Sequence, residues 1–219
     1  MRWYCLGVSV EGFGCPVATG VADHSGWAIF VSVSAKDGSP EVVDRRRVEL
    51  IEPGLPKQPY EHETAGMNAD EAERLVQEVR ESAAHCAERA LSRLRSSLGR
   101  ESVSIALRAA PLSRLPESVA EAHASWHILM RADAMLYHDA LCTAAASLGI
   151  EVATFPRGEE RREAADAMAT TTERLDLFLN GLRASLGPPW QQDHQAAAAR
   201  AMAALGRSTT LRLRKPRKP

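Results

Sequence analysis

Hydrophobic and polar positions near the start of the chain alternate in a way that predicts three consecutive strands. Residues 17–23 form a short apolar run with a glycine, which is typical of a buried strand, and residues 27–34 alternate and are rich in β-forming side chains. The segment Lys36-Asp37-Gly38-Ser39 supplies hairpin turn chemistry, after which residues 41–51 return as a third strand. Together these segments predict a three-stranded antiparallel meander.

The clearest single element is a long helix that begins after Asn68. Asn68 is a favourable N-cap residue, and Glu71 follows it by three positions, as in a capping box. Apolar side chains then recur every three or four residues as far as Leu98, and Gly99 ends the helix. Residues 103–107 are β-branched and apolar, which predicts a buried fourth strand.

The second half of the chain is mostly helical, with one more strand. Residues 116–148 have a helical pattern with a break near 125–131, and residues 150–155 predict a fifth strand that Pro156 closes. Three further helices are expected, over residues 159–169, 172–186 and 191–205. We therefore predict one α/β domain over residues 17–205, preceded by an N-terminal extension (1–16) and followed by a basic, disordered tail (206–219).

Charge is distributed unevenly along the chain. The 219 residues include 27 basic and 28 acidic side chains, but the last fourteen residues hold six basic ones and no acid. The body alone therefore carries 21 basic against 28 acidic residues, a balance that does not suit a dedicated nucleic-acid-binding domain. The four cysteines form no CxxC pair, and no apolar run is long enough to span a membrane. We expect a cytoplasmic protein with no membrane partner.

Three stretches of the sequence resemble a known family. Residues 21–28 (VADHSGWA) place an aspartate at the end of the first strand, before a glycine-containing turn. Residues 131–155 have the pattern of a helix followed by a fifth strand. Residues 190–198 (WQQDHQAAA) place an acid at the start of an alanine-rich helix. In this order the stretches resemble the ribonuclease H-like superfamily, and within it the bacterial Holliday-junction resolvases.

The resemblance implies a fold and a chemistry. The fold is a ribonuclease H-like mixed five-stranded sheet, an antiparallel meander plus two parallel strands, flanked by helices. Nucleases of this superfamily hold two Mg²⁺ ions with three or four carboxylates, so the resemblance implies Asp23 and Asp193 as metal ligands, with His194 assisting catalysis. At the end of the fourth strand the family has an acid, whereas this chain has Arg108. A glutamate on the first long helix (Glu71, Glu73 or Glu78) is the remaining source of a third carboxylate, and two acids alone would make a weak Mg²⁺ site or none.

Each of these residues also has an ordinary structural interpretation. Asp23 is equally suited to capping a hairpin turn, and Asp193 is favoured by the helix dipole in the first turn of a helix. Basic residues in the third strand and the tail can contact phosphate, or can simply protect an edge strand by charge. The candidates for nucleic-acid binding are Arg45, Arg47, Arg212, Arg214 and Lys215.

Two functions from different classes follow. The first is a metal-dependent nuclease, or a degenerate relative of one, that acts on structured nucleic acid. The alternative is a non-catalytic ribonuclease H-like module that acts through contact with a protein partner. The basic tail and the resemblance favour the first, whereas the acidic body and Arg108 favour the second, so the sequence leaves open whether the protein is an enzyme.

Overall fold

A central strand organises the molecule. In the computed structural model, which describes residues 16–99 and 103–213, β1 (Val17–His24) pairs antiparallel with β2 (Trp27–Lys36) and parallel with β4 (Val103–Arg108). Strand β3 (Ser39–Glu49) pairs antiparallel with β2, and β5 (Glu151–Phe155) pairs parallel with β4. The sheet order is β3-β2-β1-β4-β5, so the predicted meander plus two parallel strands is confirmed.

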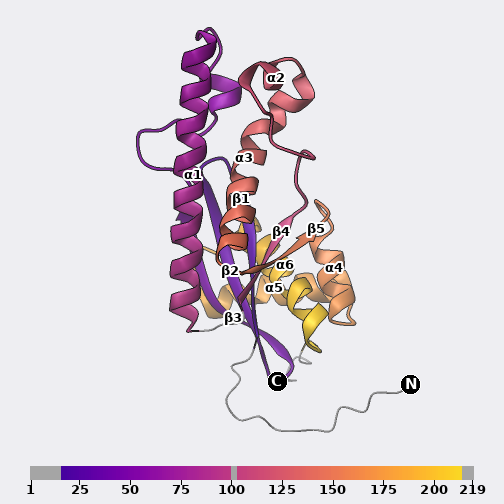
Figure 1. Cartoon of the computed structure of the whole chain (residues 1–219). Helices are drawn as coiled ribbons and strands as arrows, with labels where there is room; N and C mark the ends of the chain where they lie inside the picture. Colours follow the sequence, from indigo (N-terminus) through magenta and orange to yellow (C-terminus); the bar gives the residue numbers. More distant parts are fainter. Residues whose placement is uncertain (1–15, 100–102, 214–219) are drawn as a thin grey trace, which may run out of the picture.

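One face of the sheet is covered by the longest helices. The helix α1 (Ala69–Leu98) runs beside α3 (Trp126–Ser147), and the short α2 (Val119–His123) precedes α3 (Figure 1). A single-turn π-helix, η1 (Pro59–Glu63), packs against α3. The side chain of Asn68 accepts a hydrogen bond from the Glu71 N–H at 2.9 Å, as its capping role requires. The expected helix break near residue 125 separates α2 from α3.

The other face is covered by three later helices. They are α4 (Glu160–Ala167), α5 (Thr172–Leu186) and α6 (Gln192–Ser208), with α6 lying directly on β1 and β2 (Figure 1). A Cβ atom added to Gly20 of β1 would lie 1.7 Å from the Ala197 carbonyl oxygen, so the backbones of strand and helix are in direct contact. The alanine-rich sequence of α6 permits this approach, because small side chains leave room for the sheet.

Alternation along the strands divides the interior into two cores. Val21 of β1 and Phe30 of β2 belong to the core beneath α1 and α3. Their neighbours Ala22 and Ile29 belong to the core beneath α6. This period of two is the expected geometry of a sheet covered on both faces.

Residues 206–213 of the predicted tail are among the described residues, and they contact the domain. Helix α6 continues to Ser208, and the Leu211 side chain is buried in the core beneath α6. The Arg212 N–H donates to the Gly38 carbonyl oxygen at 2.8 Å, at the turn between β2 and β3. One buried leucine and one main-chain hydrogen bond hold this stretch, and the composition of the tail obscured both. Residues 1–15 of the predicted extension lie outside the described residues.

No helix among the described residues is long and apolar enough to cross a membrane.

Candidate functional site

Asp23 lies at the end of β1, where it forms an ion pair with an arginine. The guanidinium of Arg108, the last residue of β4, donates from Nε at 3.2 Å and from an Nη at 3.1 Å to the same carboxylate oxygen of Asp23. The Asp23 side chain is 2% exposed and that of Arg108 is 19% exposed, so the pair is nearly excluded from water. Parallel pairing of β1 with β4 brings the two strand ends together. The position that would supply a second carboxylate thus supplies a positive charge.

A second arginine approaches the same strand from α6. Arg200 is buried, and one of its Nη groups donates to the Val21 carbonyl oxygen at 2.7 Å. Its other Nη lies 3.7 Å from a carboxylate oxygen of Glu160, which is the first residue of α4. Burial lowers the pKa of Arg200, while the nearby carboxylates of Glu160 and Asp23 raise it. Each buried carboxylate near the end of β1 therefore has a guanidinium beside it.

His138 of α3 completes the surroundings of Asp23. Burial lowers the pKa of its imidazole below the ordinary value, and the Asp23 carboxylate acts in the opposite direction. Its Nε2 atom lies 3.5 Å from the Cys142 Sγ atom, one helical turn further along α3. We therefore treat His138 as a neutral side chain at pH 7.

Three buried polar atoms near this centre have no hydrogen-bond partner among residues 16–99 and 103–213. They are Asp23 Oδ1, His138 Nδ1 and Arg200 Nε. The end of β1 is therefore a polar region within the interior rather than an ordinary apolar core.

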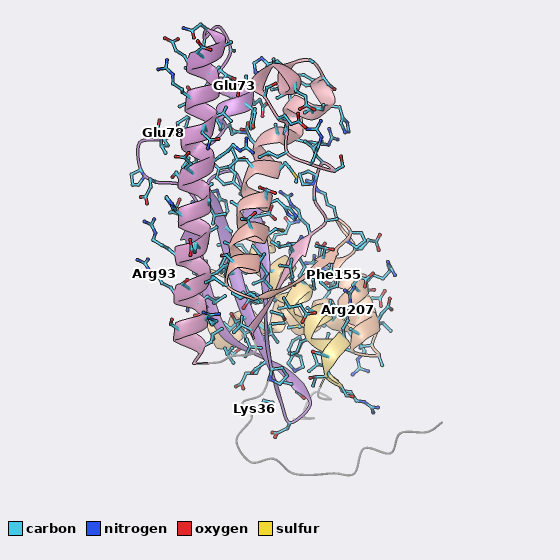
Figure 2. The ribbon with its side chains drawn as sticks, viewed as in Figure 1. Lys36, Glu73, Glu78, Arg93, Phe155 and Arg207 are labelled. Carbon is cyan, nitrogen blue, oxygen red and sulfur yellow. The ribbon has the colours of Figure 1, made fainter. Side chains whose placement is uncertain are left out.

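The donors around Asp23 do not fit Mg²⁺. In the described part of the chain, no three His, Cys, Asp or Glu side chains come together in an arrangement that could hold a metal ion. Mg²⁺ requires several hard oxygen ligands, whereas Asp23 already has Arg108 against it. The glutamates of α1 do not supply the missing ligand: Glu73 accepts from the Val119 N–H at 2.6 Å, and Glu78 is exposed on the outer side of α1 (Figure 2).

The structure assigns local roles to the other two predicted site residues. Asp193 is partly exposed in the first turn of α6, where its carboxylate lies 3.2 Å from the His24 Nε2 atom. His194 is buried, and its Nδ1 atom accepts from the Gln191 N–H at 3.4 Å to complete the N-terminal cap of α6. Burial and the Arg45 charge lower the pKa of His194. The Asp193 carboxylate is thus paired with the His24 side chain.

The arginines of β3 differ in what they contact. Arg45 donates to the carbonyl oxygens of residues 186–189, and two of these bonds are 2.6 Å long, so it holds the loop after α5. Arg46 donates to Asp44 and to Ser97 at the end of α1. Arg47 uses only its Nε–H, which donates to Glu49 at 2.9 Å, and both of its terminal amino groups are without a partner in the described residues. Among the described residues, Arg47 therefore makes fewer hydrogen bonds than Arg45 or Arg46.

Two hollows meet at Arg46 and Arg47. The first, here called the Trp27 pocket, has a volume of about 400 Å³. It is lined by Trp27, Ile29, Arg45, Arg46, Arg47, Pro189, Gln191, Asp193 and His194. The second, here called the arginine groove, has a volume of about 360 Å³ and lies between β3 and α1. It is lined by Arg46, Arg47, Val48, Glu49, Cys86, Arg89, Ala90 and Arg93.

Sequence reasoning missed four of these residues. Arg89 and Arg93 are four positions apart on α1, a spacing that places both on one helix face and that a search for basic pairs would have found. Arg200 interrupts an alanine run, which is unusual for a helix expected to be buried. The role of Trp27 depends on strand register, which the sequence does not specify. Arg214 and Lys215 lie outside the described residues.

Comparison with solved structures identifies the architecture. This chain is similar to Thermus thermophilus RuvC, with 12% sequence identity, coverage of 88% of this chain and 95% of that chain, and a TM-score of 0.51. T. thermophilus RuvC in complex with a Holliday junction substrate is similar with 12% identity, coverage of 88% and 94%, and a TM-score of 0.50. The fold is ribonuclease H-like. At this identity the likeness to RuvC establishes the fold alone.

A eukaryotic resolvase is also similar, though more distantly. The yeast mitochondrial Holliday junction resolvase Ydc2 has 12% identity, coverage of 91% of this chain and 83% of that chain, and a TM-score of 0.42. No protein-family model matches the sequence, and no curated protein matches it significantly.

Proposed function

We propose that this protein binds structured nucleic acid through its ribonuclease H-like fold and does not hydrolyse it at the Asp23 position. The ion pair between Asp23 and Arg108 is the observation that carries this proposal. Two-metal hydrolysis needs carboxylates that bind and neutralise divalent ions, and here a guanidinium already neutralises the carboxylate of β1. The protein is in this view the degenerate relative of a nuclease rather than a working one.

The arginine groove supports the binding part of the proposal. Its lining includes four arginines and one glutamate, although the body of the chain is acidic overall. Arg93 is exposed on α1, with no ion pair or hydrogen bond to any described residue (Figure 2). Arg89 is also exposed but forms an ion pair with Glu52. Local concentration of positive charge matters more than net charge, because phosphate binding is governed by the cations that replace condensed counterions.

The similar RuvC structure that contains a Holliday junction guides the choice of ligand. We therefore choose a four-way DNA junction and a linear duplex of the same sequence as the first two probes. Fluorescence anisotropy of each labelled probe is measured over a range of salt concentrations. The proposal predicts binding that weakens steeply with salt and no strand cleavage in millimolar Mg²⁺ or Mn²⁺.

Charge-neutralising variants test the groove. The double variant Arg89→Gln with Arg93→Gln is expected to weaken binding to both probes, and to reduce the slope of log K against log salt by about one for each phosphate that the protein no longer neutralises. Arg174→Gln is the matched control, because Arg174 is exposed on α5, on the opposite face of the sheet. Equal slopes for the double variant and the control would show that the groove is not the binding surface. Mg²⁺-dependent cleavage that Asp23→Asn abolishes would overturn the non-catalytic assignment.

The alternative function, contact with a protein partner, is favoured by one surface feature. Trp126 is 74% exposed at the start of α3, and Met130, one turn later, is 40% exposed. Exposed large apolar side chains that lie close together are typical of interaction sites. Absence of binding to either DNA probe at low salt would favour this alternative.

A further inference from the structure

Three flat groups stack in a row, and two of them, Trp27 and Arg47, line the Trp27 pocket. The His24 and Trp27 rings are 4.1 Å apart between centroids and are inclined by only 9°. The Arg47 guanidinium carbon lies 4.0 Å from the centroid of the Trp27 ring. Because β2 lies between β1 and β3, His24 and Arg47 approach Trp27 from its two sides. We call His24, Trp27 and Arg47 the planar column.

The Arg47 side chain, at one end of the column, can interact with a ligand in two ways, through its guanidinium face and through its terminal amino groups. A guanidinium donates hydrogen bonds within its plane and stacks through its faces, so the two interactions do not compete. One face of Arg47 is covered by Trp27, while the side chain as a whole is 49% exposed. Its terminal amino groups have no hydrogen-bond partner in residues 16–99 and 103–213. Arg47 can therefore stack on a flat ligand and bind an anionic group of the same ligand.

The remaining walls of the pocket suit the edge of a nucleobase. Gln191 is exposed and Asp193 partly so, and they provide an amide and a carboxylate beside the column. A pocket of about 400 Å³ is in the usual size range for small-molecule and cofactor sites. Arg46 lines both this pocket and the arginine groove, so a nucleic-acid strand whose phosphates lie along the groove would reach the pocket next.

We propose that the Trp27 pocket receives one unpaired nucleotide, whose base stacks on Arg47 at the end of the planar column and whose phosphate the same guanidinium binds. This inference rests on the proposed function and names the feature of structured nucleic acid that the protein selects. Unpaired bases are commonly recognised by stacking on aromatic side chains and on arginine planes, and paired bases within a duplex do not offer a free face. The protein then distinguishes a strand with an unpaired nucleotide from a continuous duplex.

The test compares three DNA duplexes of one sequence. The first is perfectly paired, the second contains a single bulged 2-aminopurine nucleotide, and the third contains an abasic site in the bulge. Binding is measured by anisotropy, and stacking of the bulged base is measured from the 2-aminopurine fluorescence. The expected result is roughly tenfold tighter binding of the bulged duplex than of the other two, with quenched fluorescence.

Conservative variants separate stacking from charge. Arg47→Lys keeps the positive charge and loses the planar group, so it is expected to abolish the preference for the bulged base while binding to the paired duplex persists. Arg174→Lys makes the same change on the exposed side of α5, outside both hollows, and is expected to retain the preference. Because neither substitution touches the core, the outcome does not depend on refolding of a damaged protein.

The possible failures are distinguishable. If the wild-type protein binds all three duplexes equally, or if Arg47→Lys keeps the preference, the unpaired-nucleotide inference is wrong and the proposed function stands. If the wild-type protein binds neither these three duplexes nor the four-way junction at low salt, the proposed function itself is wrong.

Discussion

Replacing Arg108 with alanine removes the charge that balances Asp23. The carboxylate would then remain in a position where its side chain is 2% exposed, with one oxygen already lacking a hydrogen-bond partner among the described residues. Removing one member of a buried ion pair typically costs about 3–5 kcal/mol, because the partner charge is left uncompensated. We expect Arg108→Ala to lose stability in this range.

A second substitution restores most of the balance. In the double variant Asp23→Asn with Arg108→Ala, no net charge remains buried at the end of β1, so the loss should be clearly smaller than in Arg108→Ala alone. The difference between the double variant and the sum of the single variants is the interaction energy of the pair. Exposed Arg114, which pairs with Glu121 at the surface, provides the comparison, and Arg114→Ala should cause a much smaller change.

Urea unfolding at pH 7, followed by circular dichroism, measures all of these variants against the wild type. A loss of less than about 1 kcal/mol in Arg108→Ala would contradict this prediction, because a nearly buried carboxylate without its neighbouring cation should destabilise the native state by more than that. A double variant that is no more stable than Arg108→Ala would contradict it as well. Either result would mean that Asp23 is balanced by something other than Arg108.

Two further predictions concern the supporting structure. Gly20→Ala would place a Cβ atom 1.7 Å from the Ala197 carbonyl oxygen and force α6 away from β1. Thermal unfolding should therefore show that the free energy of unfolding falls by about 3 kcal/mol or more. Gly181→Ala, which has open space around it in α5, should be neutral or stabilising. Burial raises the pKa of Asp133 from 3.8 to about 6, although the N–H groups of residues 60 and 61, which donate to its carboxylate, act to lower it. The native state therefore holds this proton more tightly than the unfolded state does. The stability that this proton contributes is full below pH 4 and is lost as the pH rises through about 6, so the wild type should lose up to about 3 kcal/mol relative to Asp133→Asn between pH 4 and 7. A difference between the two proteins that stays constant over this range would contradict the assignment.

The sequence predicts the elements well where local chemistry decides them. Asn68 and Gly99 mark the ends of α1 because a cap and a left-handed glycine act on their own neighbours, and Gly99 indeed has φ 59°. The meander follows from alternation and from the turn at residues 36–39. These features need no knowledge of distant parts of the chain.

The site depends on distant contacts, which is why the sequence predicts it less well. Asp23 is predicted as a site residue from its place at the end of a strand, but its partner Arg108 is 85 positions away and is brought near by parallel strand pairing. Arg45 was predicted to contact phosphate, and the structure instead directs its donors to carbonyl oxygens more than 140 residues away. The planar column requires the register of three strands at once. The sequence alone does not distinguish an arginine that holds a loop from one that neutralises a carboxylate or one that binds a ligand.

Two arginines, the partly buried Arg108 and the buried Arg200, balance the carboxylates near the end of β1. Parallel pairing places the ends of β1 and β4 side by side, and buried carboxylates there need a positive charge close by. Here Arg108 neutralises Asp23 and Arg200 stands beside Glu160, so the positive charge is part of the polypeptide and is present as soon as the chain folds. A guanidinium, unlike a metal ion, has no open coordination position to activate water. Under the function proposed above, this pairing accounts for the absence of hydrolysis, and the arginines of β3 and α1 are the proposed surface for nucleic acid.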